Sequence, residues 1–314
     1  MSSLTVMKGV AYTDKRCAHW LEEDGKVVLQ TKRDEFRCVV RVMEDCEGQY
    51  VTFTSASGKP LYNLQGHTDV FIDLWRRFGT TVFDTGVCID ESFDVTRRVC
   101  RASKKQYDTS GTVQQSIVEL KRKSKEVLYE HHGTLNAVFW LYDLPESECY
   151  YADRRQLMAH YCLGSQGRLM CPETEIIEAR WGDVIGTALA KVHKCFAQMV
   201  EAGHEGAMVK RFHHDYKVGR SLFWMKLKPS EEIDVSITGY TEGEGKFAGL
   251  IGSICGVAED GTEVSFSGFS DELRAEISAN REAFLGRWAE VRFMQRDSKG
   301  GLRHPQFYRW HPDK

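Results

Sequence analysis

The sequence predicts an α+β protein, with a mixed N-terminal part that ends near residue 230 and a small β-barrel after it. In the N-terminal part, short β-branched runs alternate with segments of helical spacing. Residues 229–232 (Pro-Ser-Glu-Glu) are the best candidate linker, because proline and small polar residues interrupt periodic segments. Beyond them, short β-favouring runs are separated by glycine turns, a pattern typical of a small barrel.

Periodicity places the elements of the N-terminal part. Short runs rich in β-branched and aromatic residues predict strands at Lys26–Leu29, Cys38–Met43, Tyr50–Thr54, Ala137–Tyr142, Ala207–Lys210 and Leu222–Lys228. Apolar residues recur at helical spacing in Asp69–Arg77, Gln114–Tyr129 and Val184–Glu201. We expect helices over these segments, the last of them ending before Gly203.

The C-terminal part contains short predicted strands and one helix. The strands are Val235–Tyr240, Leu250–Val257, Glu263–Phe266 and Trp288–Met294. A helix is predicted over Asp271–Arg281. The segment Gly243–Gly249 lacks the Gly-Lys-Ser/Thr ending of a phosphate-binding loop, so we interpret it as a barrel turn.

The composition is that of an ordinary folded protein. Of 314 residues, 42% are hydrophobic and 28% are charged, and the net charge of −3 argues against a uniformly basic nucleic-acid coat. None of the 10 cysteines forms a Cys-x-x-Cys pair, which disfavours a zinc ribbon. Residues 1–15 lack a signal-peptide core, and no apolar run is long enough to span a bilayer. We therefore expect a cytoplasmic protein without a membrane partner.

Lys32 is the candidate nucleophile. The β-favouring run that begins at Lys26 ends at Gln30-Thr31-Lys32, and Lys32 stands among charges in residues 30–37 (Gln-Thr-Lys-Arg-Asp-Glu-Phe-Arg). A lysine attacks only as the neutral amine, so its ordinary pKa of about 10.4 must be lowered by nearby cations or a metal ion. Taken alone, the segment also fits a solvated charged turn.

Lysines on one face of a strand indicate an anion site. In residues 223–228, strand alternation places Lys226 and Lys228 on the same face. Their charges repel unless they meet an anion such as a triphosphate. Upstream, Glu205 and Lys210 could hold a magnesium ion and a phosphate. A solvated lysine pair on a half-buried strand is the alternative.

Two further segments are candidates for phosphate contacts. Residues 303–314 combine cationic and aromatic side chains. The other segment is a basic run of Arg97, Arg98, Arg101, Lys104 and Lys105, followed by Lys121–Lys125. Cationic side chains supply the contacts that hold a duplex, although both segments also suit a solvated surface.

Together, these segments occur in the order and spacing of the ATP-dependent DNA ligases, and the chain resembles the small two-domain bacteriophage and bacterial forms. The resemblance covers nearly the whole chain and rests on motifs at residues 30–37, 139–143, 205–210, 224–228, 243–246, 268–271 and 303–314. It implies a nucleotidyltransferase (adenylation) domain over residues 1–230 and an OB-fold barrel over residues 231–314.

The resemblance also implies a reaction. Lys32 would attack the α-phosphate of ATP and expel pyrophosphate, AMP would pass to the 5′-phosphate at a nick, and the 3′-hydroxyl would then release AMP. The expected partner is nicked double-stranded DNA, bound by a monomer that works as a clamp. The expected cofactors are ATP and Mg²⁺ or Mn²⁺. The short stretch before Lys32 leads us to expect ATP rather than NAD as the donor.

Roles for individual residues follow from the same resemblance. Gln30 would accept a hydrogen bond from the adenine amino group, and Phe139 would stack on adenine. Arg37 would hold the 3′ side of the nick or the phosphate. Glu205 and Asp84 would bind the metal ion.

The cations of the motifs would contact phosphate groups. Lys226 and Lys228 would neutralise the α-phosphate and the departing charge, and Lys210 would also bind the nucleotide. The barrel would act during the first step only, when pyrophosphate would be oriented by Arg309, Asp313 and Lys314.

The chain departs from the family pattern at several positions. The lysine motif continues with Glu35 instead of glycine. Ala56 stands where the family usually has an arginine, Gly86 where it has a glutamate that touches the ribose, and His311 where it often has an arginine. We hypothesise that Glu35 supplies a displaced carboxylate.

Alternative functions remain at this point. One is an RNA ligase or a capping-type guanylyltransferase, which a preference for nicked RNA or for GTP would indicate. The other is a degenerate homologue that binds nicked ends without sealing them, in keeping with Ala56 and Gly86. The presence of Lys32, Lys226 and Lys228 argues against a mere binder, which has little need of a nucleophile.

Overall fold

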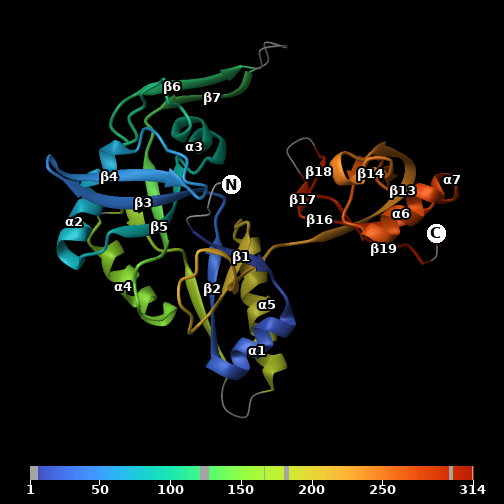
Figure 1. Ribbon diagram of the computed structural model, residues 1–314, viewed down its shortest axis with the longest axis horizontal. Helices are drawn as coiled ribbons and strands as arrows, with labels where there is room; N and C mark the ends of the chain where they lie inside the picture. The colour runs from blue at the N-terminus through green and yellow to red at the C-terminus, as the bar shows by residue number, and fades with distance from the viewer. Residues whose placement is uncertain (1–5, 121–126, 166, 180–183, 297–299, 313) are drawn as a thin grey trace. The chain divides into compact units, whose positions relative to one another are not determined.

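The computed structural model describes the chain except residues 1–5, 121–126, 166, 180–183, 297–299 and 313 (Figure 1). The chain divides into two compact units, Met1–Leu227 and Lys228–Lys314. This division lies beside the linker that the sequence predicts at residues 229–232. Within the described residues, no helix is both long enough and apolar enough to cross a membrane.

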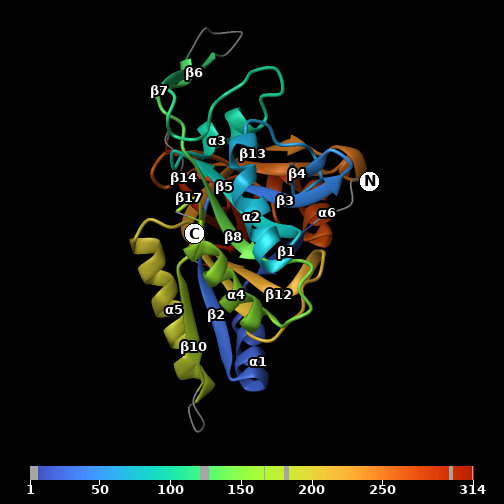
Figure 2. The ribbon, with the colours of Figure 1, turned by 90° about the vertical axis from the view of Figure 1, so that its left-hand side faces the viewer.

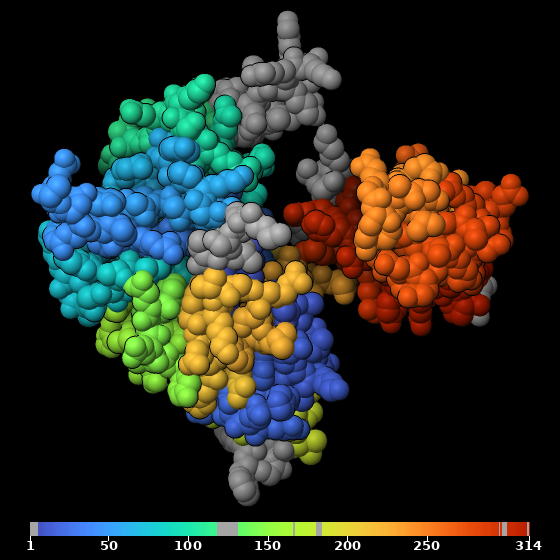
Figure 3. Space-filling view, viewed as in Figure 1, coloured from blue at the N-terminus to red at the C-terminus, as the bar shows by residue number. Residues whose placement is uncertain are grey.

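The first sheet of the N-terminal unit carries the candidate nucleophile. Its order is β1-β12-β11-β2-β10, formed by Met7–Ala11, Gly219–Leu227, Gly206–Arg211, Lys26–Lys32 and Thr174–Glu178. Helices α1 (Asp14–Asp24) and α5 (Ile185–Glu201) pack beside it (Figure 2), where Leu29, Val209 and Met225 join their core. Figure 3 shows residues near the N-terminus in dark blue beside residues near 220 in gold, in keeping with the parallel pairing of β1 with β12.

The second sheet lies over an aromatic core. Its order is β4-β3-β5-β8-β9, formed by Gly48–Ser55, Phe36–Asp45, Val82–Ile89, Ala137–Asp143 and Leu169–Met170. Around it pack the short η1 (Gln65–His67) and the helices α2 (Thr68–Phe78), α3 (Phe93–Cys100) and α4 (Tyr151–Leu163). In the core, the ring centroid of Phe71 lies 5.3 Å from that of Phe83. Residues 33–35 connect β2 to β3, so the chain passes from one sheet to the other directly after Lys32.

The predicted helix over Gln114–Tyr129 is wrong. The segment forms two antiparallel strands, β6 (Gln115–Leu120) and β7 (Val127–Gly133). Ile117 is buried in the main core of the unit, and its β-branched side chain suits an extended backbone better than a helix. The basic run Lys121–Lys125 lies outside the described residues.

The C-terminal unit is a small β-structure with its own core. Its strand order is β15-β14-β13-β16-β19, formed by Glu263–Phe266, Ile251–Ala258, Glu231–Glu242, Trp288–Phe293 and Gln306–Trp310. The backbone N–H of Phe307 donates to the carbonyl of Ser267 at 2.7 Å, which joins the two edges of this sheet. The remaining elements are η2 (Gly245–Phe247), α6 (Asp271–Ala279), α7 (Arg281–Phe284), β17 (Gln295–Arg296) and β18 (Leu302–Arg303). The predicted barrel turn and helix are confirmed as η2 and α6.

Candidate active site

Lys32 and Glu205 meet at the end of β2. Lys32 pairs with Gly206 of β11, which brings the preceding Glu205 beside it. The ammonium of Lys32 donates to the carboxylate of Glu205, and only 17% and 18% of the two side chains is exposed. The structure thus brings together the two residues that the sequence predicts as nucleophile and metal ligand.

Gln30 and Lys226 lie on the same face of this sheet. Gln30 is aligned with Met208 of β11, which is aligned in turn with Lys226 of β12. Gln30 is 2% exposed, and its Nε2 donates to Thr174 Oγ1 at 3.1 Å. The opposite face carries the apolar residues of the helix-covered core, so the polar face is the one available to a ligand.

Glu35 occupies the space above Gly86 in the neighbouring strand β5. Its carboxylate accepts from the hydroxyl of Tyr142 and pairs with Arg33 Nε at 2.5 Å. The guanidinium of Arg33 lies 3.6 Å from the ring centroid of Trp140. A Cβ at position 86 would lie less than 3.0 Å from both Glu35 and Tyr142. Burial raises the pKa of Glu35, while Tyr142 and Arg33 oppose that change.

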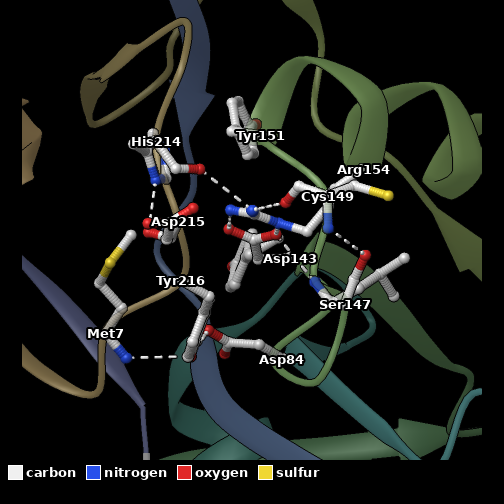
Figure 4. A network of polar contacts seen from close by, with 12 residues as sticks. Met7, Asp84, Asp143, Ser147, Cys149, Tyr151, Arg154, His214, Asp215 and Tyr216 are labelled. Carbon is white, nitrogen blue, oxygen red and sulfur yellow. Dashed lines mark hydrogen bonds and ion pairs between the residues drawn. The ribbon is translucent and has the colours of Figure 1, made fainter.

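Asp84, a predicted metal ligand, is bound by protein groups. Arg37 donates to both oxygens of the carboxylate at 2.5 Å, and the hydroxyl of Tyr216 donates to Oδ2 at 2.6 Å. Figure 4 shows Asp84 facing Tyr216, whose oxygen accepts from the backbone N–H of Met7 at 2.9 Å. A fully buried carboxylate requires such partners. Asp84 therefore holds Arg37 in place.

Lys210, a predicted nucleotide ligand, is also bound by protein groups. It is 1% exposed, and its ammonium donates to the carbonyl of Tyr142 and the hydroxyl of Tyr151, both at 3.0 Å. The ammonium lies 3.9 Å from the ring centroid of Trp224. Burial lowers the pKa of Lys210 to about 7. The ammonium of Lys210 is therefore in contact with all of these protein groups.

A buried ion pair lies close to Lys210. Arg154 Nε donates to Asp143 Oδ1 at 2.6 Å, and neither side chain is exposed. Figure 4 shows the guanidinium of Arg154 between Asp143 and the carbonyls of Cys149 and His214, which it contacts at 2.6 and 3.1 Å. The pair ties β8 to α4 and to the segment after β11.

Phe139, the residue predicted to stack on adenine, lies in the core of the N-terminal unit. It is 1% exposed, and its ring centroid lies 5.2 Å from that of Phe71 in the core. Side chains alternate along β8, so Trp140 lies on the opposite face of the strand, where its ring contacts the guanidinium of Arg33. The sequence shows two adjacent aromatic residues in this strand, but it does not indicate which of the two faces the core.

A cationic cleft of about 800 Å³ lies next to Glu35 and Arg37. Its other charged lining residues are Lys8, Lys59 and Arg101. Within the described part of the chain, no carboxylate pairs with any of these three cations. Such an excess of positive charge favours a polyanion. Arg101 was among the predicted DNA contacts, whereas Lys8 and Lys59 were missed because each stands alone in the sequence.

The other predicted DNA contacts lie in and just after α3. Arg97 pairs with Asp94 at 3.3 Å, and Arg98 is partly buried. Lys104 and Lys105 are exposed in the segment after the helix. The structure therefore brings Arg101 alone of this run into the lining of the cationic cleft.

The predicted tail residues make ion pairs within the C-terminal unit. Arg309 Nε lies 2.8 Å from Glu290, and Lys314 Nζ lies 2.7 Å from Asp234. Lys228 begins this unit, and its ammonium lies 4.0 Å from the sulfur of Met294. Asp313 lies outside the described residues.

Comparison with known proteins shows similarity to DNA ligases. The family described as "DNA ligase OB-like domain" matches residues 242–311. The structure titled "Pmar-Lig_Pre." superposes with a TM-score of 0.72 at 21% identity, covering 100% of this chain and 69% of that one. The DNA ligase of Enterobacteria phage T3 is 26% identical over 335 residues, covering 96% of this chain and 93% of that protein. The chain is thus similar to a DNA ligase over nearly its whole length.

The structural likeness also confirms the predicted fold class. The structure titled "ATP-dependent DNA ligase from bacteriophage T7 complex with ATP" has a TM-score of 0.54 at 18% identity and covers 98% of both chains. The chain thus has the predicted α+β fold of a nucleotidyltransferase domain followed by an OB-type barrel. Two of its departures from the family pattern, Glu35 and Gly86, are in mutual contact, and Ala56 lines the cationic cleft.

Proposed function

We propose that this protein is a DNA ligase that seals nicks in duplex DNA, joining a 5′-phosphate to a 3′-hydroxyl with ATP as the source of AMP. The observation that carries the proposal is the contact between Lys32 and Glu205 at the end of β2. Gln30 and Lys226 lie on the same face of that sheet. A lysine, a carboxylate, an amide and a second cation on one face suit the binding and attack of a nucleoside triphosphate.

In the first step, Lys32 Nζ would form a bond to the α-phosphorus of ATP. Pyrophosphate would leave with the electron pair of the broken P–O bond. Lys226 and Lys228 would stabilise the charge that develops on the phosphates. Gln30 Oε1 would accept from the adenine amino group, since its Nε2 already donates to Thr174.

Glu205 is the proposed ligand for Mg²⁺ or Mn²⁺. Hard divalent cations prefer carboxylate oxygens, and the carboxylate of Glu205 accepts a hydrogen bond from the ammonium of Lys32. Asp84, the other predicted ligand, is bound by Arg37 and Tyr216. When bound, the ion would neutralise phosphate charge.

Nicked double-stranded DNA is the proposed partner, and the cationic cleft is its proposed phosphate contact. Lys8, Lys59 and Arg101 would neutralise backbone phosphates there. Further contacts are proposed for Arg97, Arg98, Lys104 and Lys105.

The proposed domains are residues 1–230 for adenylation and residues 231–314 for the OB barrel. During the first step, Arg309 would leave Glu290, Lys314 would leave Asp234, and both cations would contact pyrophosphate. Both would withdraw when DNA binds. The protein is proposed to act as a monomer in the cytoplasm of a bacterial cell or a phage-infected host.

Intact mass after incubation with ATP and magnesium tests the first step. The wild-type chain should gain the mass of one AMP, and Lys32→Ala should gain none. Lys191→Ala, which removes an exposed lysine of α5, is the matched control and should react like the wild type. A wild-type chain that neither gains AMP nor carries it as purified would refute the proposal.

Nicked substrates then identify the acceptor. The AMP-bound protein should join a nicked DNA duplex and release AMP. Faster joining of nicked RNA, or a preference for GTP in the first step, would assign the chain to the RNA ligases or to the capping-type transferases.

A further inference from the structure

Cys162 and Cys171 hold their sulfur atoms 3.2 Å apart. Cys162 lies in the last turn of α4, and Cys171 directly follows β9. Both are partly buried against the main core of the N-terminal unit. A disulfide bond has an S–S distance of about 2.05 Å, so the two sulfurs need to approach by only about 1 Å.

The two thiols differ in their readiness to ionise. The hydrogen bond from Cys162 lowers the pKa of Cys171, and the positive charges of Lys210 and Arg155 act in the same direction. The same hydrogen bond raises the pKa of Cys162. The thiolate is the reactive form of cysteine, so Cys171 is the nucleophile of the pair. By contrast, burial raises the pKa of Cys38 and Cys100.

The residues after Cys171 hold the strand that ends in Lys32. The carbonyl of Glu173 accepts from the backbone N–H of Thr31 at 3.0 Å. Thr174 Oγ1 accepts from Gln30 Nε2 at 3.1 Å and donates to the carbonyl of Pro172 at 2.8 Å. A displacement of Cys171 would therefore be passed by direct hydrogen bonds to the residues before the nucleophile.

We propose that Cys162 and Cys171 are a site of reversible oxidation to a disulfide, and that this bond slows the attack of Lys32 on ATP. A peroxide serves as the oxidant. The Cys171 thiolate attacks one peroxide oxygen to give a sulfenic acid, and the other oxygen leaves as hydroxide and takes up a proton to form water. Cys162 sulfur then attacks the Cys171 sulfur, the S–O bond breaks, and a second water carries away that oxygen and the Cys162 proton. Two thiols and one H₂O₂ thus give one disulfide and two waters.

Peptide mapping after exposure to hydrogen peroxide tests the bond itself. The full-length protein should lose the mass of two hydrogens, and a cross-linked peptide should join Cys162 to Cys171. Dithiothreitol should reverse the change. Cys162→Ser and Cys171→Ser should each abolish the cross-link, whereas Cys46→Ser should leave it intact, because Cys46 is exposed and lies elsewhere. Oxidation of Cys46 without any link between Cys162 and Cys171 would overturn the proposal.

The effect on catalysis, which rests on the proposed function, is measured as the rate of lysyl-AMP formation. Oxidised wild type should react about 10-fold more slowly than reduced wild type, because displacement of a reacting group by about 1 Å costs up to about 100-fold. Cys162→Ser should show no such difference after the same treatment. A cross-linked protein that reacts at the reduced rate would overturn the coupling. A reduced protein that forms no AMP adduct would instead count against the proposed function, and peptide mapping would still decide the disulfide.

Discussion

The carboxylate of Glu35 fills the space that a side chain at Gly86 would need. A Cβ there would lie less than 3.0 Å from Glu35 Oε2 and from the Tyr142 hydroxyl. Gly86 lies in β5. Glu35 directly precedes the neighbouring strand β3, in which Arg37 is aligned with Gly86. The sequence departs from the family pattern at both positions, with a glutamate in place of glycine and a glycine in place of glutamate. In the structure the Glu35 carboxylate lies beside Gly86, which is in keeping with the hypothesis of a displaced carboxylate.

Gly86→Ala should therefore destabilise the protein. The new methyl group collides with Glu35 and Tyr142, and overpacking of this kind costs about 1–3 kcal/mol. Urea unfolding measures the loss. Gly239→Ala is the matched control because nothing lies within 4 Å of its added Cβ, and it should be neutral or slightly stabilising. Equal effects of the two substitutions would contradict the contact.

Exchanging the two residues should restore function lost by either change. Glu35→Gly removes the carboxylate and should slow lysyl-AMP formation, and Gly86→Glu alone should crowd two carboxylates into one space. The double variant Glu35→Gly/Gly86→Glu again has one carboxylate in this space, now carried by position 86 of β5. It should therefore form lysyl-AMP faster than either single variant. Strong non-additivity is expected for residues in contact. A double variant no faster than the faster of the two single variants would refute the exchange.

Asp84→Asn should damage the fold rather than metal binding. The substitution leaves Arg37 without its charged partner in a buried site, which typically costs about 3–5 kcal/mol. Chemical denaturation should show this loss. Asp69→Asn, which removes a 63% exposed carboxylate from its pair with Arg168, should change stability by less than about 1 kcal/mol. Normal stability with a weakened dependence on magnesium would instead restore Asp84 as a metal ligand.

Stability should rise with pH through the titration of Lys210. Its pKa is about 7 in the folded protein, against about 10.4 in an unfolded chain. Between these values the unfolded chain binds the extra proton, so the free energy of unfolding increases with pH across this window and falls as pH drops toward 7. We expect a gain of about 1–3 kcal/mol between pH 7 and pH 10. Lys210→Met removes the titrating group and should lack this gain when both proteins are unfolded by urea at several pH values.

Lys59→Ala should weaken the contact with DNA more than the reaction with ATP. Loss of one phosphate contact reduces the slope of log affinity against log salt by about 0.9 for duplex DNA. Filter binding or anisotropy with nicked DNA at several salt concentrations measures this slope. The exposed Lys191→Ala variant should keep the wild-type slope. If Lys59→Ala impaired lysyl-AMP formation and left the DNA slope unchanged, the cationic cleft would instead bind the phosphates of ATP.

The sequence alone determined the fold class and most of the elements that carry the site. Strands β2, β11 and β12 and helix α5 each contain a strong local period, and the nucleophile falls at a strand end in both prediction and structure. These features depend on residues close together in the chain. Alternation along a strand is local as well, so the placement of Met225 in the core with Lys226 on the other face could be predicted.

Tertiary structure alone decided which charges pair and which aromatic residues are buried. Asp84 and Tyr216 are 132 residues apart in the chain, and Glu35 and Tyr142 are 107 apart, so no local pattern indicates either contact. Both members of the pair Phe139 and Trp140 are aromatic, and only the packing of Phe71 and Arg33 on opposite sides of β8 separates them. Gln115–Leu120 forms a strand in which Ile117 is buried in the core, because tertiary burial outweighs a helical period that is merely local.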